Sequence, residues 1–424
     1  MRIRSLVARP ILDSRGAWTV EVTLELRNGA CATASVPQGK STGATEARAL
    51  PAPVAVRKIN SIVAPKLKRA DIRAGRGQNE QAALDALLIR LDGTGTKSNL
   101  GANAILATSI AFARASATAN KIPLWGHVRG LLGPAAFPSK LAVSRGLARP
   151  RLFINVINGG LHAGNNLHFQ EYLIIPKCRT IRESVEIGTQ VYRALGEALA
   201  RAKGKTATNL GDEGGYAPDF RDDKEPLYIL RTVVQKLKLA KQIDFGIDAA
   251  ATDIKKLKHK ELETMYVKLL RQNNFIYLED PFADRDFLSF AALTMRYGAS
   301  GEKNGKKSSG GNDGEPVWIA GDDLTTTNIH RMERAHAEGS INAVIIKPNQ
   351  IGTVSEALDA VRMARKYNWA VIASHRSGET DDDFIADFAY GVGADGLKLG
   401  APARGERIAK YNRLLEIEAK EARP

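Results

Sequence analysis

The chain has 424 residues, 44% of them hydrophobic and 25% charged, with a formal net charge of +15. This composition is ordinary for a globular protein and excludes a largely disordered one, and the length favours more than one compact domain. No run approaches the roughly 20 apolar residues that a membrane helix needs, and the N-terminus reads as a strand, not as a cleaved signal, so we expect a cytoplasmic protein. Two cysteines, Cys31 and Cys178, are too few for a disulfide framework, and we expect both to be small buried hydrophobic residues in a reducing compartment.

The positive charge favours anionic partners, including loose association with nucleic acid or a membrane surface. The basic residues are dispersed, however, and their densest cluster, residues 255–260, has no interleaved aromatic residues. We therefore expect a solvated helix or loop there, not a dedicated nucleic-acid site. A basic scaffold that binds RNA or another surface, with catalysis secondary, stays an alternative hypothesis.

The first part of the chain is predicted to contain strands followed by helices. Residues 1–10 are typical of a strand that enters the fold. Residues 19–26 alternate apolar and other side chains and precede a turn at residues 27–29, which predicts a β-hairpin. Helical patterns follow at residues 80–90 and 103–120.

The pattern of apolar residues changes near residue 151. The preceding stretch, residues 130–150, contains several glycine and proline residues, which are typical of a connection between domains, so we predict domains at residues 1–138 and 139–424. Beyond it, short β-branched apolar runs alternate with helical segments, which implies a parallel sheet covered on both faces. Eight such runs favour closure into a barrel. They lie at residues 153–157, 172–175, 243–247, 275–278, 317–320, 343–346, 370–373 and 396–399.

Ionisable residues end or follow several of the later runs. They are Asp248, Glu279, Asp322, Lys347, His375 and Lys398. In a closed parallel barrel the C-terminal strand ends lie on one face, where barrel active sites sit, so we expect these side chains to converge on one pocket. The longest interval, between Glu279 and Asp322, contains a segment rich in Gly, Ser and Lys at residues 300–315, which we expect to be a surface loop.

The chemistry of these side chains points to a metal site. Asp248, Glu279 and Asp322 supply hard oxygen ligands that suit Mg²⁺, which needs few protein ligands and leaves room for substrate oxygens and water. The alternative is that each acid caps a helix or pairs with a basic residue. Lys347 and Lys398 would be close to metal ions, and burial also disfavours charge, so we expect a lowered lysine pKa and a neutral lysine available as a base.

Two loops carry further polar groups. His375, Arg376 and Ser377 follow a strand and precede a glycine, and an arginine beside a hydroxyl suits a phosphate or carboxylate. Residues 211–215, Gly-Asp-Glu-Gly-Gly, form a flexible loop with paired acids. This loop is either a simple turn or a segment that presents a carboxyl group to substrate.

At these residues the sequence closely resembles the enolase family, and the matching motifs cover almost the whole chain. They include Asp-Ser-Arg-Gly at 13–16, Gly-Lys-Ser-Thr-Gly at 39–43, Asn-Gly-Gly-Leu-His-Ala-Gly at 158–164, Glu-Asp-Pro-Phe at 279–282, Asp-Asp-Leu-Thr at 322–325, Ile-Lys-Pro-Asn-Gln-Ile-Gly at 346–352 and Ser-His-Arg-Ser-Gly-Glu at 374–379. The resemblance implies an α/β fold, with an N-terminal α+β domain on a modified (β/α)8 barrel of the TIM type whose second strand runs antiparallel. It also implies two Mg²⁺ ions per active site.

The resemblance carries metal-binding roles to particular residues. Asp248, Glu279 and Asp322 resemble the ligands of the first magnesium ion. Ser41, on a loop of the first domain, resembles part of the second metal's site. The same loop departs from the family pattern, because Gln38 and Lys40 stand where small residues are usual, and Lys40 adds a cation near the second metal.

The resemblance also carries catalytic roles. Lys347 resembles the base that takes the C2 proton, and Glu213 resembles the acid that helps the C3 hydroxyl leave, with Glu171 close by. Burial and Glu171 would raise the pKa of Glu213, whereas nearby metals would oppose that, and both directions stay open. His162 resembles a loop residue that closes over the substrate. The residues that bind or line the substrate site are Gln170, His375, Arg376, Ser377 and Lys398.

The resemblance thus implies a hydro-lyase of glycolysis and gluconeogenesis that interconverts 2-phosphoglycerate and phosphoenolpyruvate. A second hypothesis is another superfamily reaction, the abstraction of a proton beside a different carboxylate. The resemblance further implies a homodimer in which the N-terminal hairpin of one chain lies near the barrel of the other. Arg9 and Glu406 are the candidate partners across that interface.

Overall fold

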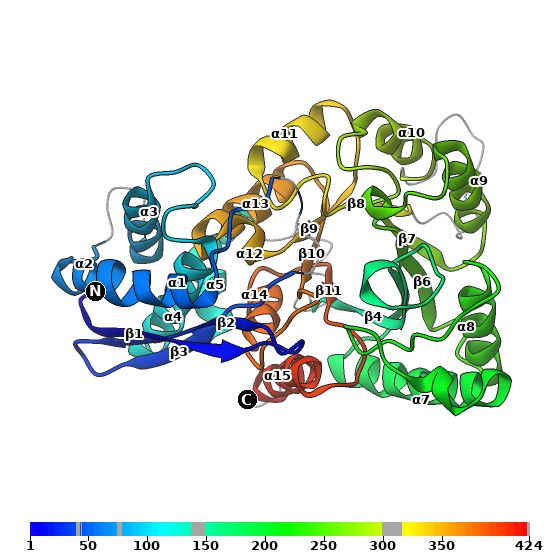
Figure 1. The fold of residues 1–424 in the computed structure, drawn as a ribbon, viewed down its shortest axis with the longest axis horizontal. Coiled ribbons are helices and arrows are strands. Elements are labelled where there is room, and N and C mark those ends of the chain that lie inside the picture. Colours follow the sequence, from blue (N-terminus) through cyan, green and yellow to red (C-terminus); the bar gives the residue numbers. More distant parts are fainter. Residues whose placement is uncertain (40–42, 44, 74–78, 137–148, 299–315, 422–424) are drawn as a thin grey trace.

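The computed structural model describes residues 1–39, 43, 45–73, 79–136, 149–298 and 316–421, which form two parts (Figure 1). A three-stranded antiparallel sheet with helices forms the N-terminal part, and a closed barrel of eight strands forms the other. The predicted fold class, an α/β protein with a TIM-type barrel and an N-terminal α+β domain, is confirmed. The predicted boundary between residues 138 and 139 and the predicted loop at residues 300–315 lie outside the described residues.

The N-terminal sheet has the order β1-β2-β3. It consists of β1 (Ile3–Leu12), β2 (Trp18–Leu26) and β3 (Cys31–Ser35). In β2, Val20, Val22 and Leu24 are buried and the residues between them are half-buried, because successive strand side chains point to opposite faces. The buried face packs against helix α4 (Ala102–Ala119), which explains the alternation seen in the sequence.

Helices complete this part of the molecule. They are α1 (Ala52–Lys58), α2 (Ala64–Arg69), α3 (Glu80–Asp92), α4 and α5 (Leu124–Leu132). The two predicted helices are confirmed as α3 and α4. Helix α4 is almost wholly buried because it packs on the sheet with one side and on barrel helices with another, and its many alanines allow both approaches.

The barrel strands follow the order β10-β11-β4-β5-β6-β7-β8-β9. They are β4 (Arg151–Asn158), β5 (Glu171–Pro176), β6 (Ile243–Asp248), β7 (Phe275–Glu279), β8 (Trp318–Gly321), β9 (Ala343–Ile346), β10 (Ala370–Ser374) and β11 (Gly396–Lys398). All eight predicted runs are therefore strands. A cluster of strand side chains that includes Phe153, Tyr277 and Ile345 lies apart from the helix-packed core, as expected for the filling of a barrel.

Strand β5 runs antiparallel to both of its neighbours, β4 and β6. The apolar runs alone predicted a parallel sheet and were wrong at this strand, whereas the family resemblance predicted the reversal correctly. A parallel neighbour needs a crossover, usually a helix, but residues 159–170 between β4 and β5 hold only the short turn Gly160–His162. The chain therefore returns along the barrel, and β5 begins at the end where β4 and β6 finish.

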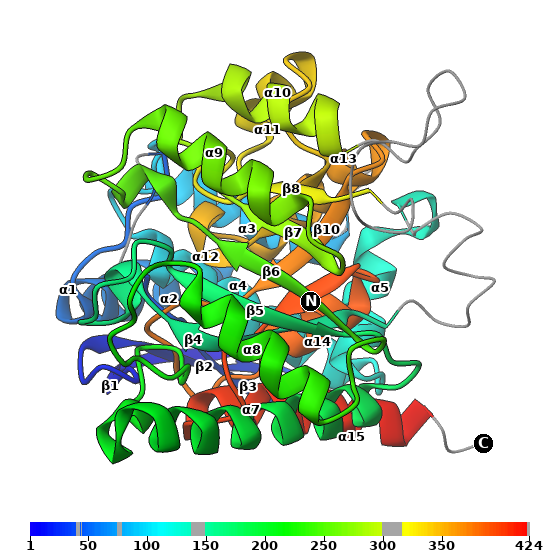
Figure 2. The ribbon, with the colours of Figure 1, turned by 90° about the vertical axis from the view of Figure 1, so that its right-hand side faces the viewer.

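Helices surround the barrel on its outer side (Figures 1 and 2). They are α7 (Ile181–Lys203), α8 (Glu225–Lys236), α9 (His259–Leu270), α10 (Phe287–Tyr297), α11 (Ile329–Ala337), α12 (Pro348–Ile351), α13 (Val354–Lys366), α14 (Phe384–Gly391) and α15 (Gly405–Glu421). Helix α15 packs against both α7 and α14. Its first turn therefore lies beside the loop that follows β10.

Partly buried ion pairs join the N-terminal part to the barrel. Arg114 of α4 donates to Asp382 and Asp383, each at 2.6 Å, and Asp382 also accepts from the backbone N–H of Ser35. Lys97 pairs with Glu356 of α13 at 2.8 Å. Because a buried pair that loses one partner leaves an uncompensated charge, these contacts hold the two parts in one arrangement.

Three minor expectations can also be compared with the structure. Cys31 and Cys178 are both unpaired, but Cys31 is exposed and Cys178 is half-buried, so the expectation that both are buried is wrong. The basic cluster at residues 255–260 is mostly exposed and leads into α9, which agrees with a solvated segment. Among the described residues, no helix combines the length and the apolar character needed to cross a membrane.

Candidate active site

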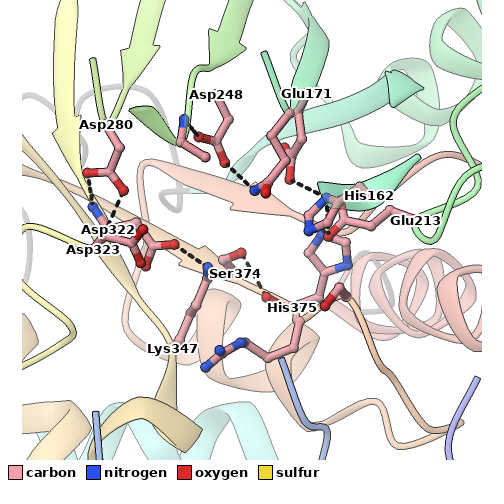
Figure 3. Close-up of a pocket in the computed structure, with 14 residues that line it drawn as sticks. His162, Glu171, Glu213, Asp248, Asp280, Asp322, Asp323, Lys347, Ser374 and His375 are labelled. Atoms are coloured by element: carbon pink, nitrogen blue, oxygen red, sulfur yellow. Dashed lines mark hydrogen bonds and ion pairs between the residues drawn. The ribbon is translucent and has the colours of Figure 1, made fainter. Parts of the chain in front are cut away.

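A polar pocket lies where the barrel strands β6 to β10 end (Figure 3). It is lined by His162, Gln170, Glu171, Glu213, Asp248, Ala250, Asp280, Asp322, Asp323, Lys347, Ser374, His375, Arg376 and Ser377. Glu279 and Lys398 are buried directly behind it, in contact with Asp248. The structure therefore brings together every predicted site residue except Ser41, which lies outside the described residues, as does Lys40.

Strand register explains why the acids meet. Glu171 is the cross-strand neighbour of Asp248, and Asp248 is the neighbour of Glu279. Adjacent strands are about 4.8 Å apart, so three carboxyl groups stand in a row across β5, β6 and β7. Glu171 joins this row only because β5 is antiparallel: it is the first residue of its strand, whereas Asp248 and Glu279 are the last of theirs.

Lys398 contacts all three acids of this row. Its Nζ lies 3.0 Å from Glu171 Oε2, 3.2 Å from Asp248 Oδ2 and 2.6 Å from Glu279 Oε2, and its side chain is 2% exposed. Burial by itself lowers the pKa of Lys398, but the three carboxylates outweigh burial and raise that pKa well above its usual value.

The second lysine, Lys347, donates to Asp322 Oδ2. Burial lowers the pKa of Lys347, and Asp322 reverses this and raises it. The protein groups alone therefore raise the pKa of both lysines, and the lowering expected beside bound metal ions stays a prediction. Each lysine touches carboxylates directly, so attraction to them exceeds both burial and the repulsion between the two ammonium groups.

Asp322 belongs to a second acidic group that the sequence analysis did not single out. Oxygen atoms of Asp280, Asp322 and Asp323 all lie within 4.8 Å of one another. Asp280 accepts hydrogen bonds from the backbone N–H groups of Asp322 and Asp323, and burial together with Asp322 raises the pKa of Asp323 to about 7. The acid pairs at residues 279–280 and 322–323 were the signal that could have identified this group.

The donor set fits a divalent cation of the magnesium type. The side chains of Asp248, Glu279 and Asp322 offer only oxygen, and Oε1 of Glu279 is buried without a hydrogen-bond partner among the described residues. Burial and Asp248 also raise the pKa of Glu279 to about 8, a sign of uncompensated negative charge. Among the described residues, these three acids are not, however, one of the groups whose ligand atoms all lie within 4.8 Å of one another; Asp322 instead accepts from Lys347 and Glu279 from Lys398. The ligand set therefore stays a prediction.

A buried cluster on the other side of the pocket surrounds Glu213. Its carboxylate accepts a hydrogen bond from Asn155 Nδ2 at 3.0 Å and lies 3.5 Å from His162 Nδ1 and 3.4 Å from His375 Nε2. Glu171 is close as well, since its Oε1 is 3.8 Å from the same nitrogen of His162. Asn155 was not foreseen from the sequence.

The pKa values of the two glutamates in this cluster shift in opposite directions. Burial raises the pKa of Glu171 well above its usual value, and the charge of Glu213 adds to the effect. Burial also acts to raise the pKa of Glu213, but His375, His162 and Arg407 reverse this and hold it well below its usual range. Within the pair, the protein groups therefore favour a proton on Glu171 over one on Glu213.

The loop after β10 faces the N-terminal part of the chain. Arg376 is buried and pairs with Glu46, at 2.9 and 3.1 Å, and its backbone N–H donates to Glu379. Ser377 is buried beside it. Nothing in the sequence pattern marked Glu46, because it lies more than 300 residues from Arg376 and follows the segment that carries Ser41.

The neutral imidazole of His375 predicts a pH-dependent contribution to stability. Burial lowers the pKa of His375 from 6.5 to about 4, so between these values the unfolded chain binds a proton that the folded chain does not. The free energy of unfolding of the wild type should therefore fall relative to that of His375→Asn as the pH decreases from 6.5 to 4. The change is up to about 3 kcal/mol, at about 1.4 kcal/mol per pH unit.

Denaturant unfolding of both proteins at several pH values measures this difference. His330→Asn, which alters an exposed histidine, serves as the control. A wild-type advantage that stays constant from pH 6.5 to 4 would contradict the assigned neutral state of His375.

Comparisons with known proteins agree with this geometry. The family model described as "Enolase, N-terminal domain" matches residues 3–128, and "Enolase, C-terminal TIM barrel domain" matches residues 147–423. The chain is 41% identical to an enolase of Methanopyrus kandleri over an alignment of 442 positions, which covers 98% of this chain and 95% of that one. It is 38% identical, with the same coverage, to enolases of Solanum lycopersicum and Methanocaldococcus jannaschii. The family resemblance seen in the motifs is thus confirmed, and the chain belongs to the enolase family.

Proposed function

We propose that the chain is a phosphopyruvate hydratase, which reversibly removes water from 2-phosphoglycerate to give phosphoenolpyruvate in glycolysis and gluconeogenesis. The observation that carries the proposal is the division of the pocket: Lys347 lies on one side, and Glu213, Glu171 and His162 lie on another (Figure 3). A dehydration of this kind needs a base for the C2 proton and an acid for the C3 hydroxyl at different faces of one substrate. Neither alternative, a basic scaffold that binds RNA or another superfamily reaction, is favoured by the comparisons.

Lys347 is the proposed base. To accept the C2 proton it has to be neutral, and its ion pair with Asp322 raises its pKa. Asp322 is also a proposed metal ligand, so this ion pair and metal binding compete for the same carboxylate. Lys398 is the proposed partner of the negative charge that develops on the substrate carboxylate, because it is buried, cationic and held rigidly by three acids.

Glu213 is the proposed acid for departure of the hydroxyl, with Glu171 beside it. The raised pKa of Glu171 supports a supply of protons at this side of the pocket, and His162, which neighbours both glutamates, could accept or pass one. The proposed substrate-binding residues, which line the pocket or contact its acids, are Gln170, His375, Arg376, Ser377 and Lys398.

Magnesium is the proposed cofactor, with two ions per active site. Asp248, Glu279 and Asp322 would hold the first ion, and Ser41 would contribute to the second. When bound, the ions stabilise negative charge on the substrate carboxylate and so make its neighbouring proton more acidic.

The first test is the activity itself. Purified protein with Mg²⁺ and 2-phosphoglycerate should produce a rise in the ultraviolet absorbance of the enol product, and chelation should abolish it. Lys347→Ala should lower kcat by at least about 10²-fold, since a positioned general base contributes 10²–10⁴. Lys366→Ala, which removes an exposed lysine from α13, is the matched control. Full activity in Lys347→Ala would exclude Lys347 as the base.

Metal binding provides a second test that does not depend on turnover. Titration calorimetry with Mn²⁺ should show at least about tenfold weaker binding to Asp248→Asn than to the wild type, because one hard charged ligand is lost. Asp253→Asn alters an exposed acid five residues away and should bind normally. Equal affinity of all three proteins would refute the assigned ligand set.

We further propose a homodimer that is located in the cytoplasm. The N-terminal hairpin supports the dimer, because Val7, Leu12 and Trp18 expose 59%, 55% and 58% of their surface. Arg9, which pairs with Glu21 within the chain, is the proposed partner of Glu406 in the second chain. No role in binding nucleic acid is proposed.

Sedimentation at micromolar concentration tests the dimer. The wild type should sediment with twice the 45.9 kDa of one chain, and Trp18→Arg should shift the protein towards the monomer because it places a charge in the proposed apolar contact. Leu288→Arg, on the outer surface of α10, is the control. A monomeric wild type would refute the proposal.

A further inference from the structure

Arg407 is a wholly buried cation in the first turn of α15. In the part of the chain that the structure describes, no carboxylate accepts a hydrogen bond from it; the nearest, Glu406 Oε1, lies 3.6 Å from its Nε, and both atoms lack a hydrogen-bond partner. Arg413, on the same helix, instead pairs with Asp387 through two nitrogens. A guanidinium stays charged in proteins, and burial of a charge without a bonded counter-ion is unfavourable, so Arg407 needs a functional explanation.

The donors of Arg407 link two loops of the candidate active site. Nη1 donates to the carbonyl oxygen of Arg376 and Nη2 to that of Ser377, each at 2.7 Å. Nη2 also donates to the carbonyl oxygen of Asp212 at 3.3 Å, one residue before Glu213. The guanidinium therefore fixes the loop after β10 relative to the loop that carries Glu213.

The guanidinium also contacts the ring of His375. Nη1 of Arg407 is hydrogen-bonded to Nδ1 of His375. Because a guanidinium can only donate, Nδ1 has to accept, so it carries no proton. In a neutral imidazole the remaining proton is then on Nε2, and this nitrogen lies 3.4 Å from Glu213 Oε2.

We propose that Arg407 is a positioning residue that fixes the Nε2–H tautomer of His375 and thereby makes His375 a donor to Glu213. The opposite tautomer would place a ring lone pair against the carboxylate and repel it. With the fixed tautomer, the Nε2–H group of His375 lies 3.4 Å from Oε2 of Glu213, which also accepts from Asn155 at 3.0 Å, so polar hydrogens face this oxygen from two residues. The nearby charge of Arg407 also disfavours an imidazolium, consistent with the lowered pKa of His375.

Nitrogen NMR of the full chain labelled with ¹⁵N-histidine tests the tautomer directly. The His375 signals are identified by their loss in His375→Asn. In the wild type, Nδ1 should have the chemical shift of an unprotonated nitrogen and Nε2 that of a protonated one. A wild-type His375 with the proton on Nδ1, or with both tautomers populated, would overturn the proposal without any variant of Arg407.

Variants then test whether Arg407 is the cause. Arg407→Met should give His375 a mixture of tautomers, whereas Arg407→Lys, whose ammonium group is also only a donor, should restore the Nε2–H form at least partly. Arg413→Met removes a partly buried arginine from the same helix and should leave the tautomer unchanged. Retention of a pure Nε2–H form in folded Arg407→Met would refute the role of Arg407. If Arg407→Met does not fold, the tautomers of His375 in the wild type and in Arg407→Lys still test the proposal.

Kinetics separate positioning from a general structural role. This part rests on the proposed function. Arg407→Met should lower kcat at least tenfold with a smaller change in KM, and the loss should largely disappear in a His375→Asn background, because both changes remove the same donor. If Arg407→Met and His375→Asn lower kcat additively, Arg407 does not act through His375, and the proposal is refuted. If the protein lacks hydratase activity but the tautomer depends on Arg407, the proposed function fails and the positioning inference stands.

Discussion

The concentration of acidic groups at one end of the barrel is the constraint on which the rest of the site depends. Glu171, Asp248 and Glu279 are neighbours across three strands and are almost wholly buried. Like charges at this spacing in a poorly hydrated interior repel strongly, so they require cations at the same place. Lys398 meets this need by contacting all three, and the raised pKa of Glu279 shows that some negative charge is still uncompensated.

The reversal of β5 is what creates this concentration. In an all-parallel barrel, the residue of β5 beside Asp248 would be the last of its strand, and Glu171 would lie at the opposite end. The short connection after β4 instead reverses the chain direction. Its turn contains His162, its last residue is Gln170, and Glu171 begins β5. One change in strand direction thus supplies a loop and an acid to the same pocket.

The site is also a product of contacts between distant segments. Arg376 of the barrel pairs with Glu46 of the N-terminal part, and Arg114 and Lys97 join the two parts through partly buried ion pairs. Helix α15, near the end of the chain, supplies Arg407 to the loops of His375 and Glu213. The pocket therefore depends on the position of both the N-terminal part and the last helix of the chain.

Local sequence determined the strands, the helices α3 and α4, and the acids and lysines at the strand ends, because side-chain periodicity and strand termini are local properties of the chain. The motifs added the enolase family and the antiparallel strand, which periodicity alone had read as parallel. Only the tertiary structure decided which partner each charge has. It pairs Lys347 with Asp322, Lys398 with three acids, Arg376 with Glu46 and Arg407 with His375. These partners lie 25 to 330 residues apart, and the pKa of a buried group is set by neighbours within a few ångströms, which the order of residues does not specify.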